Sequence, residues 1–208
     1  NATSGLGIEK RKLKQSVYDV IINGTPTKDA IVTTKFGDVL PASADLAGAG
    51  VELLAIDDPN YCLKKALAQV KQDYDVIFID CPPSLEMLTL NGLSAADGIL
   101  IPVQCEYFAL EGLGQLINTI NLVKKHLNKE IQIEGALLTM YDVRTNLSNQ
   151  VVKEVKKYFD EKVYKTVIPR NVRLSEAPSY GMPISIYDPK SKGAKAYEKF
   201  AKELLKIK

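Results

Sequence analysis

The chain has 208 residues and a formal net charge of +2; 46% of its residues are hydrophobic and 25% are charged. This length is enough for one α/β domain with a substantial core, and the small net charge excludes a polycation, so any contact with nucleic acid must come from a local patch. No apolar run approaches the ~20 residues that a membrane-spanning helix needs.

The first sixty residues predict short elements separated by turns. A helix is expected over 14–22, because Val17, Val20 and Ile21 follow the helical period, and Gly24 ends it. The other elements expected here are a loop over 1–7, a short helix beginning at Thr27 and containing Ala30, Ile31 and Val32, a strand over 38–42 and a helix over 46–54.

From residue 62 onward, amphipathic helices alternate with continuous apolar runs. The run 76–79 (Val-Ile-Phe-Ile) has no polar residue, as expected of a strand with both faces covered. This alternation predicts an α/β fold with a mostly parallel sheet and helices on both faces, and a single domain over 1–208. The helices are expected over 62–72, 85–96, 109–127, 148–159 and 192–207, and the strands over 76–79, 98–103, 133–140 and 163–168.

Polar residues follow three of the expected strands, at the position where open parallel sheets bind ligands. Asp80 comes directly after 76–79, so its carboxylate is expected at the sheet edge, where it could bind Mg²⁺ directly or through water. A helix-capping or turn role before two prolines is the alternative. Gln104 and Glu106 follow the next strand, and Pro169-Arg170-Asn171 follows the last one.

Other common sites are missing from the sequence. No G-x-x-x-x-G-K-[ST] motif occurs, although such a loop would normally bind the phosphates that an acid like Asp80 serves. Cys62, Cys81 and Cys105 have no C-x-x-C spacing, which favours free thiols in a reducing cytoplasm over a zinc site. The one histidine, His126, is expected at a solvated helix end rather than as a catalytic base.

The segment 74–84, with Asp80-Cys81-Pro82-Pro83-Ser84, resembles the Walker B region of the ParA/Soj chromosome- and plasmid-partitioning ATPases. The likeness continues through 101–113, 142–146 and 167–178, in the order of that family, and spans essentially the whole chain. The resemblance implies a P-loop ATPase fold of the deviant Walker A type, with ATP and Mg²⁺ as cofactors.

The first residues depart from the family pattern. Members begin with a strand, a K-G-G-x-G-K-[ST] loop, a helix and a second strand, and residues 1–7 resemble what directly follows that segment. The resemblance therefore implies that the first strand, the P-loop and the second strand are absent, and the chain as given is expected to be catalytically inactive.

The resemblance also assigns nucleotide-binding residues. Asp80 would support the Mg²⁺ coordination shell and hydrolysis. The alternatives are a solvated helix start for the two residues after the strand 98–103, and ordinary packing at strand ends for the residues of the adenine pocket. Gln104 and Glu106 would lie near the place where the family dimerises around ATP, and the adenine pocket would be formed by Met140, Pro169, Arg170 and Asn171.

The resemblance further implies DNA binding without sequence preference. Arg144 and Arg173 align with arginines that serve this purpose in Soj-like proteins, and both are expected in polar loops that could reach phosphates. Lys190 and Lys192 could extend the same patch, although surface arginines and lysines are commonly only solvated.

The implied protein is a cytoplasmic, nucleoid-associated switch. ATP would drive formation of a homodimer that binds double-stranded DNA, because two weak patches on one dimer bind more tightly than one. A ParB-like partner would stimulate hydrolysis. Two rivals stay open: a non-functional fragment, and a MinD-like ATPase that grips membranes with an amphipathic C-terminal helix. The last expected helix has apolar residues that fit docking on the sheet equally well, and no membrane contact is expected.

Overall fold

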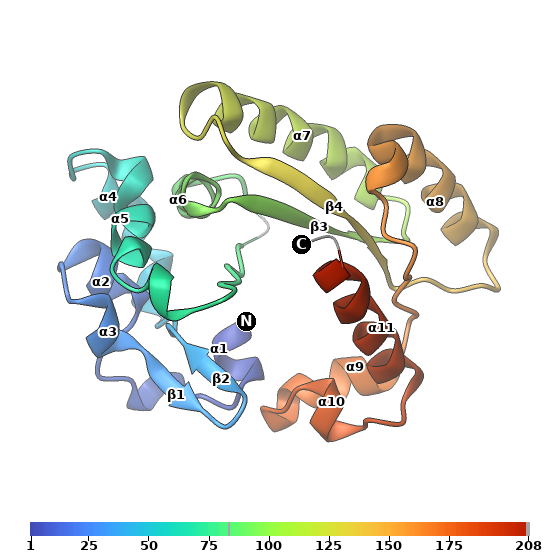
Figure 1. The fold of residues 1–208 in the computed structure, drawn as a ribbon, viewed down its shortest axis with the longest axis horizontal. Helices are drawn as coiled ribbons and strands as arrows, with labels where there is room; N and C mark the ends of the chain where they lie inside the picture. The colour runs from blue at the N-terminus through green and yellow to red at the C-terminus, as the bar shows by residue number, and fades with distance from the viewer. Residues whose placement is uncertain (83, 207–208) are drawn as a thin grey trace. The chain divides into compact units, whose positions relative to one another are not determined.

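The computed structural model describes residues 1–82 and 84–206, and the chain divides into two compact units (Figure 1). The first unit comprises Asn1–Asp97 and Ile120–Ile131, and the second comprises Gly98–Thr119 and Gln132–Lys208. The elements are α1 (Ala2–Gly5), α2 (Val17–Ile22), α3 (Thr27–Ala30), β1 (Val32–Thr34), β2 (Gly37–Val39), α4 (Ala49–Leu53), α5 (Cys62–Ala68), α6 (Met87–Ala95), β3 (Gly98–Gln104), α7 (Ala109–His126), β4 (Gln132–Thr139), α8 (Asn146–Phe159), α9 (Val172–Glu176), α10 (Ile184–Tyr187), α11 (Lys192–Lys206) and the 3-10 helices η1 (Lys10–Lys12), η2 (Asp45–Ala47), η3 (Pro59–Tyr61), η4 (Lys71–Asp73), η5 (Asp160–Lys162) and η6 (Ala177–Tyr180).

The first unit is held together by short helices and a two-stranded hairpin. Ser16 starts α2 because its backbone N–H donates to the Asp19 carboxylate at 2.8 Å, as in a capping box. In α4, Ala49 and Leu53 are fully buried in an apolar cluster that also contains Ile21. These contacts explain why the predicted helices over 14–22 and 46–54 form, although both are shorter than expected.

Two buried asparagines tie α6 to its surroundings in the first unit. The Asn91 side chain accepts the Leu63 backbone N–H at 3.1 Å and donates to the Pro59 carbonyl oxygen at 2.7 Å. The Asn128 side-chain amide donates to the carbonyl oxygens of Leu93 (3.1 Å) and Ala96 (2.8 Å) at the end of α6. Such helix-end carbonyls have no partner within the helix, so Asn128 satisfies groups that would otherwise be buried unpaired.

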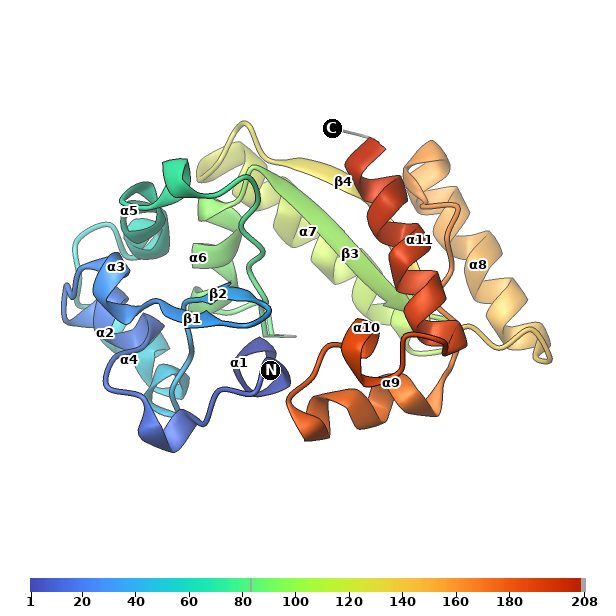
Figure 2. The same cartoon turned by 60° about the horizontal axis from the view of Figure 1, so that its bottom comes forward.

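The second unit contains the parallel pair β3–β4, in register through Ile101↔Ala136 and Val103↔Leu138. Figures 1 and 2 show α7 and α8 on one face of this pair and α11 on the other. Phe200 of α11 packs on Leu137 in a buried cluster. Because parallel strands are covered on both faces, their sequences are continuous apolar runs, and the predicted α/β class is confirmed.

The predicted strand over 76–79 is wrong. Among residues 1–82 and 84–206, no β-ladder or isolated bridge includes this segment. Its apolar side chains are not covered either, since Val76 and Ile77 are exposed and Phe78 is 73% exposed. An apolar run becomes a strand only when neighbouring backbone supplies hydrogen-bond partners, and none of the described backbone does so here.

The predicted strand over 163–168 forms no regular ladder. The isolated bridge Ala136↔Val163 falls within it, and the bridge Tyr141↔Pro169 lies just beyond its end. Between these bridges, the backbone N–H groups of Lys165 and Thr166 donate to the Glu203 carboxylate of α11, at 2.6 and 2.9 Å. A side chain from the terminal helix thus takes hydrogen bonds that a regular ladder would have used.

Smaller differences concern element boundaries. The helix predicted from Thr27 ends at Ala30, because Val32 pairs with Val39 in the β1–β2 hairpin. The strand predicted over 38–42 is β2, which ends at Val39. Ile207, included in the predicted terminal helix, and Pro83, part of the Walker B-like motif, lie outside the described residues.

Gly135 is a position where β4 tolerates no side chain. A Cβ atom there would lie 2.7 Å from the Lys162 carbonyl oxygen and 2.7 Å from Cε2 of the buried Tyr164 ring. We expect Gly135→Ala to lower the free energy of unfolding by about 1–3 kcal/mol, because a backbone carbonyl cannot easily move away. Urea unfolding measures this change.

Gly112 in α7 is the matched control, since a Cβ there would meet none of the described atoms within 4 Å. Gly112→Ala should raise the free energy of unfolding by up to ~1 kcal/mol through helix propensity. Equal effects of the two substitutions would contradict the close packing at Gly135.

Candidate functional site

Asp80 directly follows residues 76–79, the segment of the first unit that forms no strand, and its side chain is exposed. One carboxylate oxygen accepts the backbone N–H of Ala2 at 2.9 Å. Asp80 does not cap α6, because that helix begins at Met87 with Glu86 in the N-cap position. The sequence-based alternative of a capping role at α6 is therefore wrong.

An exposed carboxylate such as Asp80 suits Mg²⁺, which takes one or two carboxylates and completes its shell with water and substrate phosphates. Within the described parts of the chain, no group of three or more His, Cys, Asp or Glu side chains is placed to hold a metal ion. Asp80 alone would therefore contribute to an ion held mainly by a nucleotide and water.

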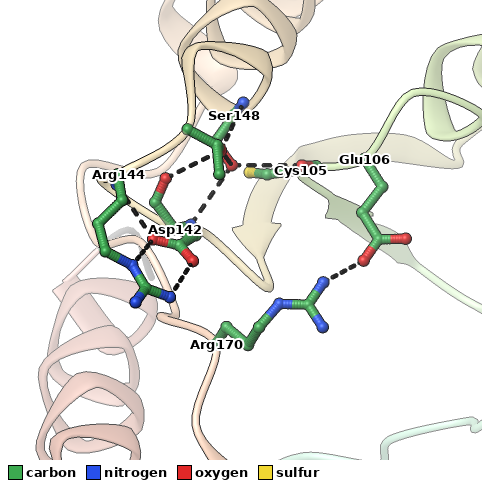
Figure 3. Close-up of polar contacts among 7 residues, drawn as sticks. Cys105, Glu106, Asp142, Arg144, Ser148 and Arg170 are labelled. Atoms are coloured by element: carbon green, nitrogen blue, oxygen red, sulfur yellow. Dashed lines mark hydrogen bonds and ion pairs between the residues drawn. The ribbon is translucent and has the colours of Figure 1, made fainter.

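In the second unit, the side chains of Glu106 and Arg170 are in contact. Glu106 follows β3 in sequence, and Arg170 lies beside Tyr141, which follows β4. Their side chains form an ion pair between guanidinium NH2 and carboxylate Oε1 (Figure 3). The backbone supports this arrangement, because Arg170 N–H donates to the Tyr141 carbonyl oxygen at 3.0 Å. The structure thus brings two predicted nucleotide-binding residues, Glu106 and Arg170, into direct contact.

The remaining predicted nucleotide-binding residues lie in the same part of the second unit. Gln104 ends β3, where it pairs with Thr139, and Met140 follows β4 directly. Met140 has φ of 54°, a left-handed conformation that is uncommon for a side chain of this size. Pro169 bridges to Tyr141, and the side chain of Asn171 caps α9.

A hollow of ≈ 400 Å³ lies between β3 and α7 in the second unit. Gln104 and Glu106 contribute polar groups to its lining, and Val103 and Phe108 contribute apolar surface. Apolar walls with a few polar groups are typical of small-molecule sites. Met140, Pro169 and Asn171 do not line this hollow.

Arg144 is fixed at the surface by the loop that precedes α8. Its Nε and NH2 donate to the two carboxylate oxygens of Asp142 at 2.9 and 2.7 Å, and its backbone N–H donates to the same carboxylate at 3.0 Å (Figure 3). Thr145 caps α8 by accepting the Ser148 backbone N–H at 3.3 Å. The Arg144 side chain is 83% exposed, so its outer N–H groups face solvent.

Hydrogen bonds from Arg144, helped by the charge of Arg170, lower the pKa of Asp142 to about 2. We expect Arg144→Gln to raise this pKa toward the ordinary value of about 3.9, because the guanidinium no longer stabilises the carboxylate. NMR titration of the Asp142 carboxyl carbon measures the change. Any stability from this pair is present above about pH 4 and is lost as the pH falls toward 2, because the folded-state pKa is the lower one.

Arg173→Gln is the matched control for this titration. Arg173 pairs with other carboxylates, so its loss should leave the pKa of Asp142 near 2. An Asp142 carboxyl that titrates near 4 in the unaltered protein would contradict the bidentate pair.

Arg173 lies in the short helix α9, so the prediction of a loop at this position is wrong. Two carboxylates hold its side chain. Its NH1 is 2.9 Å from Glu176 Oε2, and its Nε is 3.5 Å from Asp188 Oδ2. Its backbone N–H donates to the capping side chain of Asn171 at 3.0 Å. The exposed Lys190 and Lys192 follow Asp188 closely in sequence, so the contact with Asp188 places Arg173 near the segment that carries them.

The two predicted DNA-binding arginines lie on different elements. Sequence reasoning missed their carboxylate partners Asp142, Glu176 and Asp188. The spacing Arg173-x-x-Glu176 could have indicated one of these pairs, since residues three apart on a helix are neighbours. No sequence signal indicated the contact with Asp188.

The chain is similar to known proteins over most of its length. A family model described as an AAA domain matches residues 1–133. The chain is 60% identical to the sporulation initiation inhibitor protein Soj of Bacillus subtilis, over 98% of this chain and 81% of that protein. It is 50% identical to the chromosome partitioning protein ParA of Myxococcus xanthus, over 99% of this chain and 74% of that protein.

A solved structure gives a similar result. The crystal structure of cobyrinic acid a,c-diamide synthase from Mycobacterium smegmatis, with bound ADP and magnesium, superposes with a TM-score of 0.84. The match has 41% sequence identity and covers 98% of this chain and 76% of that one.

Proposed function

Because the chain belongs to the family of Soj and ParA chromosome-partitioning ATPases, we propose that it acts as a nucleotide-dependent switch that binds DNA. Partitioning is favoured over a synthase activity, because the identity to the Soj protein is much higher than the identity to the synthase. The 208 residues are proposed to form one ATPase domain, supported by relatives that match nearly the whole chain.

The observation that supports DNA binding best is the pair of exposed arginines in the second unit. Arg144 and Arg173 are each oriented by carboxylates, and each still turns N–H groups toward solvent. Guanidinium groups bind phosphate through planar, paired hydrogen bonds, and contacts to phosphates give affinity without sequence preference. Lys190 and Lys192 are proposed to add charge beside Arg173.

Nucleotide binding is assigned to other residues. Asp80 is proposed to support Mg²⁺, and the adenine wall is proposed to include Met140, Pro169, Arg170 and Asn171. Gln104 and Glu106 are proposed to lie near the ATP-dependent dimer contact. Since the sequence has no G-x-x-x-x-G-K-[ST] motif, the 208 residues alone are expected to hydrolyse no ATP.

The proposed partners follow from this assignment. They are double-stranded DNA bound without sequence preference, a second copy of the protein in the ATP-bound state, and a ParB-like protein that stimulates hydrolysis. The proposed location is the nucleoid in the cytoplasm. Among the helices that the structure describes, none is both long and apolar enough to cross a bilayer.

Fluorescence anisotropy with labelled DNA duplexes of unrelated sequence tests the proposal. We expect weak binding at low salt, equal for all sequences, that falls steeply as salt rises, because each phosphate contact makes the slope of log K against log salt concentration more negative by about 0.9. Absence of binding at low salt would contradict the proposal. Flotation of the protein with anionic lipid vesicles, without DNA binding, would favour the membrane-surface alternative.

A further inference from the structure

Arg173 in the second unit is flanked by carboxylates from two segments. Glu176 lies one helical turn further along α9, and its Oε2 is 2.9 Å from Arg173 NH1. Asp188 directly follows α10, and its Oδ2 is 3.5 Å from Arg173 Nε. Figures 1 and 2 show α9 and α10 side by side. We call Glu176 and Asp188 the acid clamp.

The acid clamp contacts the donors with which an arginine binds phosphate. A guanidinium offers paired N–H groups along two edges, one formed by Nε with NH2 and one by NH1 with NH2. In Arg173 each edge has a nitrogen that faces a carboxylate, so a phosphate that approaches either edge meets a group of its own charge. Arg144 differs, because Asp142 contacts Nε and NH2 and leaves NH1 without a carboxylate among the residues that the structure describes.

Two tyrosines hold the acid clamp in place. The Tyr187 hydroxyl donates to Glu176 Oε2 at 3.2 Å, and the same oxygen faces Arg173. The Tyr187 ring stacks on that of Tyr180, with centroids 5.0 Å apart and planes at 28°. Asp188 is the next residue after Tyr187, so the stacked ring also restricts the second carboxylate. The acid clamp is therefore more ordered than an ordinary surface ion pair, which must fix two free side chains.

We propose that the acid clamp competes with DNA phosphate for Arg173 and thereby limits the affinity of a single copy for DNA. This competition, which rests on the proposed DNA binding, requires a phosphate to displace Glu176 or Asp188 before it forms paired hydrogen bonds with the guanidinium. Affinity without sequence preference is electrostatic, so the two nearby negative charges weaken it further. One copy then binds DNA weakly, and tight binding needs a second copy.

Fluorescence anisotropy of the 208-residue chain with a labelled duplex, at one fixed low salt concentration, tests the competition. Asp188→Asn should bind the duplex about two- to fivefold more tightly than the unaltered chain, as expected when one exposed ion pair no longer has to be broken. The double variant E176Q/D188N should bind roughly tenfold more tightly, because both carboxylates lose their charge. Damage to the fold would weaken binding, so a gain in affinity separates competition from structural loss.

Glu161→Gln is the matched control for Asp188→Asn. It changes the net charge by the same amount at an exposed glutamate of the same unit, and it lies before the segment 163–168 whereas Arg173 follows that segment. Its affinity for the duplex should stay close to that of the unaltered chain. In an Arg173→Gln background, the gain from Asp188→Asn should disappear, since no guanidinium remains to be released.

Inorganic phosphate is a second probe, which does not require DNA binding. NMR spectra follow the Nε–Hε signal of Arg173 while phosphate is added. The signal should respond at lower phosphate concentrations in E176Q/D188N than in the unaltered chain, because the carboxylates no longer compete for the guanidinium. Asp188→Asn alone should give a smaller change in the same direction, and it serves for both probes if the double variant does not fold.

The proposal is overturned if the folded variants Asp188→Asn and E176Q/D188N bind the duplex no more tightly than the unaltered chain, since the carboxylates would then only orient Arg173. It is also overturned if Glu161→Gln gives the same gain, because the effect would be one of net charge. If no form of the chain binds DNA, but phosphate reaches Arg173 more readily in E176Q/D188N, the clamp is confirmed and the DNA-binding function is wrong. Failure of both probes overturns both proposals.

Discussion

Arg173→Glu is expected to abolish binding to double-stranded DNA. The substitution replaces a guanidinium with a carboxylate beside Glu176 and Asp188, which now stand 2.9 and 3.5 Å from Arg173 nitrogens. Three carboxylates would then lie where a phosphate must approach. Because affinity without sequence preference is almost entirely electrostatic, a reversal of charge at this point removes more than one contact.

Salt-dependent anisotropy with a labelled duplex measures this loss. Arg11→Glu is the matched control, since Arg11 lies in η1 of the first unit and the net charge changes by the same amount. In a form of the protein that includes the P-loop segment of the family, ATP binding should be unchanged by Arg173→Glu. Equal loss of ATP and DNA binding would contradict separate sites, and an equal effect of Arg11→Glu would reduce the result to net charge.

Phe200→Ala is expected to lower the free energy of unfolding by about 3–5 kcal/mol. Phe200 is 7% exposed and belongs to the cluster of Leu137, Tyr164 and Ile168. Its ring centroid is 4.9 Å from that of Tyr164, with the planes at 88°, a favourable edge-to-face arrangement. Truncation would leave a cavity where α11 packs on the β3–β4 pair, in addition to the loss of buried apolar area.

Urea unfolding followed by circular dichroism measures this effect. Leu205→Ala is the matched control on the same helix, because Leu205 is 65% exposed, and it should change stability by less than about 0.5 kcal/mol. Similar destabilisation by both substitutions would show that α11 does not pack through Phe200. Burial of Phe200 also favours docking of α11 on the second unit over the lipid-binding role that sequence alone left open.

Sequence periodicity was a good guide for β3, β4 and α8. The continuous apolar runs at β3 and β4 and the amphipathic pattern of α8 predicted elements within one or two residues of those observed. The apolar run 76–79 and the segment 163–168, which includes Lys165 and Thr166, were both predicted as strands, yet neither forms one. Ladder formation depends on distant backbone and, for 163–168, on the Glu203 carboxylate, which period and composition do not reveal.

The residues of the candidate site could be selected from the sequence, but the contacts between their side chains could not. The family resemblance selected Glu106 and Arg170 separately, and the structure shows that they pair with each other. It also selected Arg144 and Arg173, but gave no indication that carboxylates orient them. Side-chain partners of this kind depend on loop geometry at the strand ends, which the sequence pattern leaves open.

The Glu203 carboxylate couples the opening of α11 to that of the segment containing Lys165 and Thr166. While the flanking amides of Tyr164 and Ile168 donate to carbonyl oxygens of β4, the carboxylate accepts hydrogen bonds from two successive amides, of Lys165 and Thr166. If α11 detaches, those amides lose their acceptor at the same moment, so terminal helix and segment should fluctuate as one cooperative foldon rather than fray separately. The last helix therefore governs the local dynamics of the chain leading to Arg170 and Arg173.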